Sequence, residues 1–200
     1  MIGAHPGGVE LTKRLLALSD VKPPAKVLDL GAGSGASIHC LNDLGYEGVG
    51  VDLAAGTDDL VLEEDMTALP FADESYDLCL AECSVSVCGD GPLALREAYR
   101  VLRRGKSLLL SDVYFKKDCA PCLSMPGPMT QSLWEQEIQK AGFTIQKFQD
   151  ETALWRAFFL ESLWNDNADA ACCDFFKAAG KAGCRYFLAW LKKGEEDGPI

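Results

Sequence analysis

The sequence predicts an α/β protein with a doubly wound parallel sheet, and two observations support that prediction. First, residues Lys26–Gly35 read Lys-Val-Leu-Asp-Leu-Gly-Ala-Gly-Ser-Gly, an apolar run that ends in closely spaced glycines. A short apolar run bounded by turn residues is typical of a buried parallel strand. Second, strand-like and helix-like segments alternate from this point as β-α-β-α-β, which is the order that produces a parallel sheet.

The individual elements follow from apolar periodicity and from turn residues. The expected strands are Val27–Leu30, Gly48–Val51, Leu60–Leu62, Tyr76–Ala81, Ser107–Val113, Phe143–Phe148 and Cys184–Leu191. The expected helices are Val9–Leu18, Ala36–Leu44, Pro92–Leu102, Thr130–Ala141, Ala153–Leu163 and Ala170–Ala179. Apolar residues recur at helical spacing in the helices, whereas the strands are short apolar runs.

Two details of these elements are specific enough to be checked. We expect Arg103, Arg104 and Gly105 to end the helix over Pro92–Leu102, because cations favour a helix C-terminus and glycine suits the residue beyond it. The short segment that follows Asp52 leaves room for only a helical turn or two over Ala54–Asp59, because a full crossover helix needs more residues.

The acidic composition limits what the protein is expected to bind. Lys and Arg number 19 against 30 Asp and Glu, which gives a formal net charge of −11. We expect no nucleic-acid partner, because phosphate backbones require a basic footprint and no Lys/Arg cluster is present. We expect no membrane partner either, because no apolar run is long enough to span a bilayer. His5–Gly8 stands where a signal peptide would need apolar residues, so we expect a cytoplasmic protein.

Length and cysteine content complete these expectations. The 200 residues, 48% of them hydrophobic, suit a single domain over residues 1–200. Within it, residues 1–22 form an N-terminal cap segment and residues 192–200 a charged tail. In a reducing compartment the nine cysteines are expected to be free thiols, metal ligands or redox groups rather than disulfides. We expect no bound metal, and Cys119 and Cys122, spaced as half a metal site, are the thiolate candidates.

Five segments occur in the same order as the motifs of one enzyme family. They are Val27–Gly35, Gly48–Asp52, Glu64–Phe71, Tyr76–Glu82 and Leu95–Asp112. Together they resemble the class I S-adenosylmethionine-dependent methyltransferases, in the small-molecule group related to quinone-biosynthesis and arsenite methyltransferases. The resemblance implies a Rossmann-like, mostly parallel seven-stranded sheet whose antiparallel last strand is inserted near the fifth.

The resemblance also implies S-adenosyl-L-methionine as the cofactor. This molecule carries a sulfonium, an ammonium and a carboxylate but no phosphate, so acids and backbone groups rather than arginines should line its site. By resemblance, Asp52 would bind the ribose, Asp65 the adenine amino group, and Met66 the adenine ring, while Asp29 would help to hold the methionine end. The implied cofactor-binding residues are Asp29, Gly31, Gly33, Gly35, Asp52, Leu53, Asp65, Met66 and Glu82.

Methyl transfer is an in-line displacement at carbon, for which the enzyme mainly supplies alignment and a dry site. A base is needed only where the nucleophile must lose a proton. The catalytic candidates are Glu82 and Cys83, which follow the fourth strand, and His5, which precedes the first helix. A packed thiol is the favoured interpretation of Cys83.

Three alternatives remain open at this point. The loop after Asp112 resembles that of arsenite methyltransferases, in which thiolates such as Cys122, with Cys83 or Cys88, would hold trivalent arsenic. Gly31-x-Gly33-x-x-Ala36 also satisfies the dinucleotide fingerprint, which would indicate an NAD-type oxidoreductase. A non-catalytic module that binds the cofactor without turnover is the third alternative.

Overall fold

The computed structural model describes residues 5–116, 130–164 and 177–195. Its strands are β1 (Lys26–Leu30), β2 (Glu47–Asp52), β3 (Val61–Glu63), β4 (Tyr76–Glu82), β5 (Leu102–Phe115), β6 (Phe143–Asp150) and β7 (Cys184–Lys193). Its helices are α1 (Gly8–Leu18), α2 (Ala36–Asp43), α3 (Gly91–Val101), α4 (Gln131–Lys140) and α5 (Thr152–Trp164). The elements therefore alternate as the sequence predicts, with boundaries that shift by a few residues.

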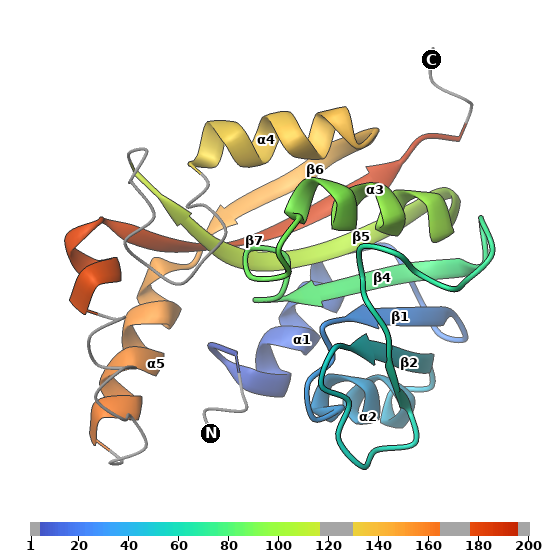
Figure 1. The fold of residues 1–200 in the computed structure, drawn as a ribbon, viewed down its shortest axis with the longest axis horizontal. Coiled ribbons are helices and arrows are strands. Elements are labelled where there is room, and N and C mark those ends of the chain that lie inside the picture. The colour runs from blue at the N-terminus through green and yellow to red at the C-terminus, as the bar shows by residue number, and fades with distance from the viewer. Residues whose placement is uncertain (1–4, 117–129, 165–176, 196–200) are drawn as a thin grey trace.

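The strands form one mixed sheet in the order β3-β2-β1-β4-β5-β7-β6 (Figure 1). Strands β1 to β5 pair in parallel, whereas β7 is antiparallel to both β5 and β6. The seven-stranded, Rossmann-like arrangement with an antiparallel last strand is thereby confirmed. Because β1 and β4 are central neighbours, their carboxyl ends meet near the middle of one edge of the sheet.

Alternating residues of the central strands separate two apolar cores, one on each face of the sheet. Leu28 of β1 and Cys79 of β4 face the core that α3 and α4 cover, whereas Val27 and Leu78 face the core that α1, α2 and α5 cover (Figure 1). Side chains that alternate along a strand point to opposite faces, so both faces of this sheet are buried. The continuous apolar runs in the sequence reflect this double burial.

The connection from β2 to β3 contains only turns and bends, as its length predicted. Asp58 stabilises this connection through its side chain, which accepts the Leu60 N–H at 3.0 Å and lies 2.5 Å from His39 Nε2 on α2. The connection therefore passes close to α2 without forming a crossover helix of its own.

The expected end of the third long helix was wrong. Helix α3 ends at Val101, and Leu102 already begins β5, so Arg103, Arg104 and Gly105 belong to the strand. The register shifts here, where Tyr76 pairs with Leu102 but Leu78 pairs with Ser107. Asp77, which lies opposite the extra residues, pairs with Arg103 at 2.8 Å and with Lys106 at 3.4 Å. These contacts, together with Gly105 at φ 68°, make the charged segment an irregularity within a strand.

The C-terminal half matches its predicted elements where it is described. Thr130 caps α4 by accepting the Leu133 N–H at 3.3 Å, and Gly142, at φ 101°, follows the helix. Of the helix expected over Ala170–Ala179, only its last residues lie in the described part, where residues 177–181 are helical. In the described residues, no helix is both long and apolar enough to cross a membrane.

Candidate functional site

The candidate site lies where β1, β2 and β4 end side by side. Its centre is the turn after β1, whose Gly31 and Ala32 N–H groups donate to the Val51 carbonyl of β2 at 2.8 and 3.0 Å. Two pockets, of about 270 and 200 Å³, flank this turn and share Gly31 and Cys83 as lining residues. Ligands of open α/β sheets bind outside the carboxyl ends of the strands, so this edge is the expected place for a binding site.

Two glycines allow the chain to pack this closely around the turn. Gly31 has φ 81°, and a Cβ built on it would lie 2.4 Å from the Ser84 Cβ. A Cβ on Gly50 of β2 would lie 2.4 Å from the Ala32 Cβ and 2.5 Å from Ile38 Cδ1. Gly31 was predicted from the sequence, whereas Gly50 was not, because its requirement arises only once α2 packs on β2.

The smaller pocket is lined by Gly31, Asp52, Leu53, Glu64, Asp65, Met66, Cys83, Ser84, Val87 and Cys88. It therefore brings together four of the predicted binding residues, Asp52, Leu53, Asp65 and Met66, from the ends of β2 and β3. Asp52 accepts the N–H groups of Gly33 at 2.8 Å and of Ala54 at 2.9 Å, and so ties the glycine turn to β2. The hydroxyl and N–H of Thr67 donate to Asp65 and hold the pKa of its carboxyl below the ordinary value.

The larger of the two pockets is lined by His5, Gly8, Val9, Gly31, Ala32, Gly33, Ser34, Ala36, Ser37, Glu82 and Cys83. It lies between the segment that begins α1 and the glycine turn that begins α2, whose N-cap is Gly35 at φ 80°. The predicted catalytic candidates His5, Glu82 and Cys83 are thus brought together, although they lie far apart in the sequence.

Glu82 is the most constrained polar residue of this pocket. Its Oε2 accepts the hydroxyl of Thr12 at 2.8 Å and that of Ser37 at 3.0 Å, and lies 3.5 Å from His5 Nε2. Burial raises the pKa of its carboxyl, which His5 and the two hydroxyls oppose. Thr12 and Ser37 could not be predicted from the sequence, because they reach Glu82 only after α1 and α2 have packed on the sheet.

Cys83 directly follows Glu82 at the end of β4 and has an unusual backbone conformation. Its φ is 56°, an uncommon value for a residue with a side chain, and its Sγ lies 3.2 Å from the Tyr186 hydroxyl. Tyr186 in turn donates to the Ser111 hydroxyl at 2.9 Å. Burial and the nearby Asp112 raise the pKa of the Cys83 thiol well above its ordinary value. These features favour a packed thiol over a thiolate nucleophile.

Two further carboxyls lie beneath the site. Asp29 is 3% exposed, and burial together with Glu82 and Asp52 raises its pKa well above the ordinary value. It is not among the residues that line either pocket, so it lies behind the turn rather than in it. Asp112 accepts the Ser86 N–H at 2.9 Å and so fixes the loop after β4.

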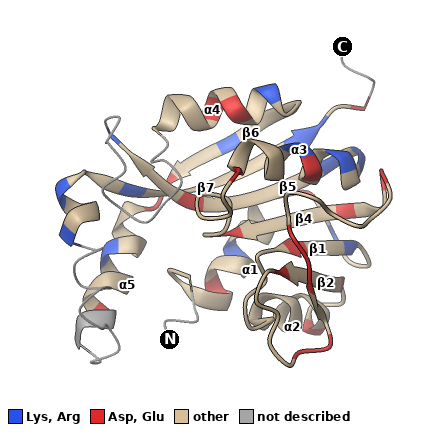
Figure 2. Ribbon diagram, in the orientation of Figure 1, with Lys and Arg blue, Asp and Glu red and all other residues tan. Residues whose placement is uncertain are grey.

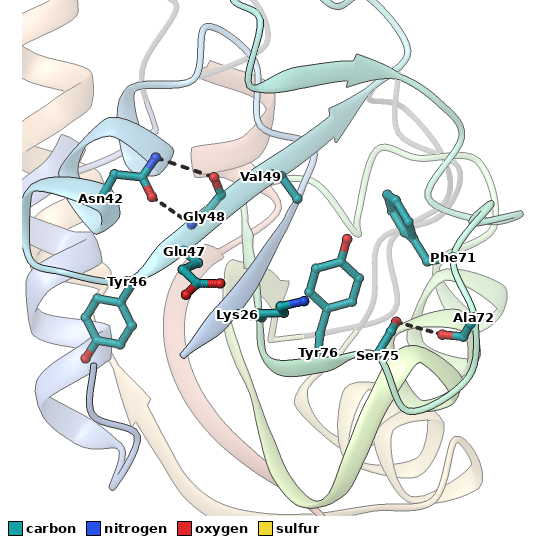
Figure 3. A pocket seen from close by; sticks show the side chains of 10 residues that line it. All are labelled: Lys26, Asn42, Tyr46, Glu47, Gly48, Val49, Phe71, Ala72, Ser75 and Tyr76. Atoms are coloured by element: carbon teal, nitrogen blue, oxygen red, sulfur yellow. Dashed lines mark hydrogen bonds between the residues drawn. The ribbon is translucent and has the colours of Figure 1, made fainter. Parts of the chain in front are cut away.

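A larger pocket, of about 530 Å³, lies at the other end of the strands (Figure 3). It is lined by Lys26, Asn42, Tyr46, Glu47, Gly48, Val49, Phe71, Ala72, Ser75 and Tyr76. Lys26 and Tyr76 begin β1 and β4, so this pocket faces the amino ends of the strands. We do not assign it to the chemistry, because none of the predicted site residues reaches it.

The charged residues are distributed unevenly over the sheet. Acidic residues follow the β2–β3 connection and lie at both ends of β4, whereas Lys and Arg gather where β5 begins (Figure 2). Among the described residues, no Lys or Arg lines either of the two pockets at the glycine turn. Within the described ranges, no three His, Cys, Asp or Glu residues are grouped to hold a metal ion. Cys119 and Cys122 lie outside the described residues.

Comparison with known sequences agrees with this geometry. The sequence model of the family described as "Methyltransferase domain" matches residues 28–110, which run from β1 into β5. A malonyl-[acyl-carrier protein] O-methyltransferase of Serratia marcescens is 31% identical over 111 residues, which are 51% of this chain and 44% of that protein. An arsenite methyltransferase of Aquipseudomonas alcaligenes is 34% identical over 113 residues, covering 44% of this chain and 33% of that protein. The chain thus spans less than half the length of these relatives.

Solved structures show the same fold. The [4+2]-cyclase SpnF superposes with a TM-score of 0.79 at 20% identity, covering 94% of this chain and 82% of that one. Phosphoethanolamine N-methyltransferase 2 of Haemonchus contortus, in complex with S-adenosylhomocysteine, gives a TM-score of 0.77 at 16% identity, covering 95% and 54% of the two chains. The solved structures show a Rossmann-like fold for this chain, and the family model and the sequence relatives show that its segment from β1 into β5 is similar to methyltransferases.

Proposed function

We propose that this protein transfers a methyl group from S-adenosylmethionine to a small-molecule acceptor. The observation that supports this most directly is the pair of pockets that meet at Gly31 and Cys83. They lie at the carboxyl ends of the strands, where this fold places its ligands, and all their charged lining residues except His5 are carboxylates. Such a site suits a cofactor with positive groups and no phosphate.

Two features of the chain fit that cofactor. A Cβ at Gly31 would collide with Ser84, so only glycine leaves the turn open to a ligand. Two buried side-chain atoms of the described residues, Glu82 Oε1 and Ser84 Oγ, have no hydrogen-bond partner, and each residue lines one of the two pockets. Buried polar atoms are normally satisfied, so this pair is consistent with a polar ligand that spans both pockets.

We assign the adenosine half of the cofactor to the smaller pocket. Asp52 would accept the ribose hydroxyls and Asp65 the adenine amino group, while Leu53 and Met66 would pack against the ring. Asp52 and Asp65 follow neighbouring strands, and Met66 is only 9% exposed, so these groups already face one cavity.

We assign the methionine half to the glycine turn. The start of α2, from Ser34 to Ser37, would face its carboxylate, and Asp29, behind the turn, would favour its ammonium. Glu82 would then stand beside the positive sulfonium. These roles rest on the resemblance of the motifs and on the shared pockets.

The cofactor supplies a methyl group that is activated for transfer, because it is bound to a sulfonium whose sulfur is a good leaving group. The protein then has to align the acceptor and to exclude water. The two pockets meet at the end of β4, where Glu82 is the last residue of the strand and Cys83 and Ser84 follow it. His5, Gly8 and Val9 line the larger pocket from the side of α1. No covalent step on Cys83 is required, in agreement with its raised thiol pKa.

Calorimetric titration tests the cofactor, and transfer of the isotopically labelled methyl group to a panel of small acceptors tests the reaction. We expect S-adenosylmethionine and S-adenosylhomocysteine to bind, and NAD to give no measurable heat. Tight binding of NAD without binding of S-adenosylmethionine would replace the proposal by an oxidoreductase. Cofactor binding with no transfer to any acceptor would instead support a non-catalytic module.

A metalloid acceptor is a second candidate, which two observations favour. One sequence relative is an arsenite methyltransferase, and Cys83 and Cys88 line the same pocket. Soft trivalent arsenic prefers thiolate ligands and carries its own lone pair, so no base would be needed. The test is to incubate the protein with S-adenosylmethionine, arsenite and a thiol. Methylated arsenic that is lost in Cys88→Ser but kept in Cys40→Ser, whose thiol lines neither pocket, would support this candidate.

A further inference from the structure

Glu82 is a buried carboxylate whose two oxygens have different surroundings. Its side chain is 3% exposed, so its carboxylate is removed from water. Its Oε2 accepts hydrogen bonds from Thr12 and Ser37, whereas its Oε1 has no partner among the described residues. A buried carboxylate oxygen that lacks a donor is costly, and a ligand N–H is the kind of group that would satisfy it.

His5 lies beside this carboxylate and is more exposed to solvent than Glu82. Its Nε2 is 3.5 Å from Glu82 Oε2, and its side chain is 15% exposed, against 3% for Glu82. The other ring nitrogen, Nδ1, lies 3.4 Å from the Pro6 carbonyl. A proton that reaches Glu82 therefore has a titratable neighbour through which it can pass to solvent.

The surrounding charges determine which acceptors are compatible with this pair. Among the described residues, no Lys or Arg lines either pocket, whereas Asp52, Glu64, Asp65 and Glu82 do. Asp29 lies close enough to Glu82 for the two charges to raise the Asp29 pKa. The charge of Glu82 also raises the pKa of three other groups, which are Cys40 on α2, Cys83 after β4 and Tyr186 on β7. The carboxylates near Glu82 would repel a carboxylate or phosphate acceptor, while an ammonium would be attracted.

We propose that the acceptor is an amine, and that Glu82 binds its ammonium and, with His5, takes its proton. This inference rests on the proposed methyl transfer and names the class of its substrate. The ammonium R–NH₃⁺ donates to Glu82 Oε1 and passes one proton to the Glu82–His5 pair, which leaves R–NH₂ with a free lone pair. The nitrogen then bonds to the methyl carbon as the S–C bond breaks, and that electron pair stays on sulfur. The abstracted proton leaves through His5.

The test uses the protein loaded with S-adenosylhomocysteine and three probes of equal length, n-hexylamine, 1-hexanol and hexanoate, with benzylamine, benzyl alcohol and benzoate as a second set. Calorimetry should show an amine binding at least tenfold more tightly than its matched alcohol, and no binding of either carboxylate. Glu82→Gln should weaken amine binding tenfold or more and change the affinity for S-adenosylhomocysteine less than threefold. Unfolding curves check that the variant is folded.

Turnover of the bound amine gives a second measurement. His5→Gln should slow methylation of that amine tenfold or more and shift its pH profile, while the affinity for the amine remains. His39→Gln is the matched control, because His39 lies on α2 beside Asp58 and lines neither pocket. An equal loss in both histidine variants would contradict the role of His5.

Several outcomes would overturn the inference. One is a carboxylate that binds as well as the matched amine, and another is an amine no tighter than its alcohol in both sets. A third is a Glu82→Gln variant that loses as much affinity for S-adenosylhomocysteine as for the amine, because Glu82 would then hold the ammonium of the cofactor. Failure of the wild-type protein to bind S-adenosylhomocysteine at all would instead contradict the proposed function.

Discussion

At the scale of single residues, the site is a set of short polar side chains held by backbone groups. Asp52 accepts two backbone N–H groups and Asp65 is held by Thr67, so both carboxylates are oriented before any ligand arrives. The sequence predicted these two acids from their positions at strand ends. It could not predict Thr12, Ser37 or Tyr186, because their contacts with Glu82 and Cys83 join segments that are distant in the chain.

Replacement of Asp52 by alanine should weaken cofactor binding and leave the fold intact. A charged hydrogen bond to the ribose hydroxyls contributes on the order of 1.5–3 kcal/mol, which is roughly ten- to a hundred-fold in affinity. Titration of Asp52→Ala with S-adenosylhomocysteine measures this loss. Asp59→Ala, an exposed acid in the same connection, is the control and should bind as the wild type does. Unchanged affinity in a folded Asp52→Ala protein would remove Asp52 from the site.

Gly31→Ala should destabilise the protein because the new methyl group meets Ser84 at 2.4 Å and the residue has φ 81°. We expect a loss of roughly 2–4 kcal/mol, from the positive φ and from overpacking together. Gly33→Ala, with φ 55° and nothing within 4 Å, has the backbone cost without the collision and should lose about 1–2 kcal/mol. Urea unfolding of both variants, and of Gly31→Ala with Ser84→Gly, separates the two causes. No recovery in the double variant would argue against the collision.

At the scale of elements, the sequence predicted the type of each strand and helix better than its ends. The helix expected over Pro92–Leu102 ends at Val101, and the residues expected to end it, Arg103–Gly105, belong to β5, where Arg103 and Lys106 pair with Asp77 on the neighbouring strand. A cationic segment followed by glycine suits both a helix end and a strand irregularity, so local preference could not decide between them. The contact with Asp77, which lies far away in the sequence, decides between the two conformations.

Ionisation of Asp112, near the end of β5, should make the stability of the protein depend on pH. Burial raises the pKa of Asp112 from its ordinary value of 3.8 to about 6, against the opposing hydrogen bonds from Ser86 and Val113. The folded state therefore holds a proton that the unfolded chain has already released between these two values. Stability should fall as the pH rises from 3.8 to about 6 and should then level off, with a total change on the order of 3 kcal/mol.

The Asp112→Asn variant cannot ionise at this position, so it should lack this part of the pH dependence. Urea midpoints of wild type and variant at pH 4 and pH 7 provide the comparison. The difference in stability between the variant and the wild type should shift in favour of the variant from pH 4 to pH 7. Any loss of stability from the altered hydrogen bonds applies at both pH values. An equal pH dependence in the two proteins would show that Asp112 is not the titrating group.

At the scale of the whole molecule, the parallel half of the sheet could be predicted from residue patterns alone. The insertion of β7 between β5 and β6 could not, because Cys184–Lys193 carries no signal of its neighbours. Only the resemblance to a family predicted it. The sequence placed the site at the strand ends, since parallel strands bring their carboxyl ends to one edge. The division into two pockets depends on how α1 covers the glycine turn, which required the structure.

We propose that the two pockets at the glycine turn form one cofactor site, and a crystal structure of the complex with S-adenosylhomocysteine would decide this. We expect the adenosine between Asp52 and Asp65, the amino-acid end at the glycine turn, and the sulfur next to Glu82. Binding in the pocket between Lys26 and Tyr76 at the other end of the strands, or a cofactor that leaves Asp52 and Asp65 without contact, would contradict it.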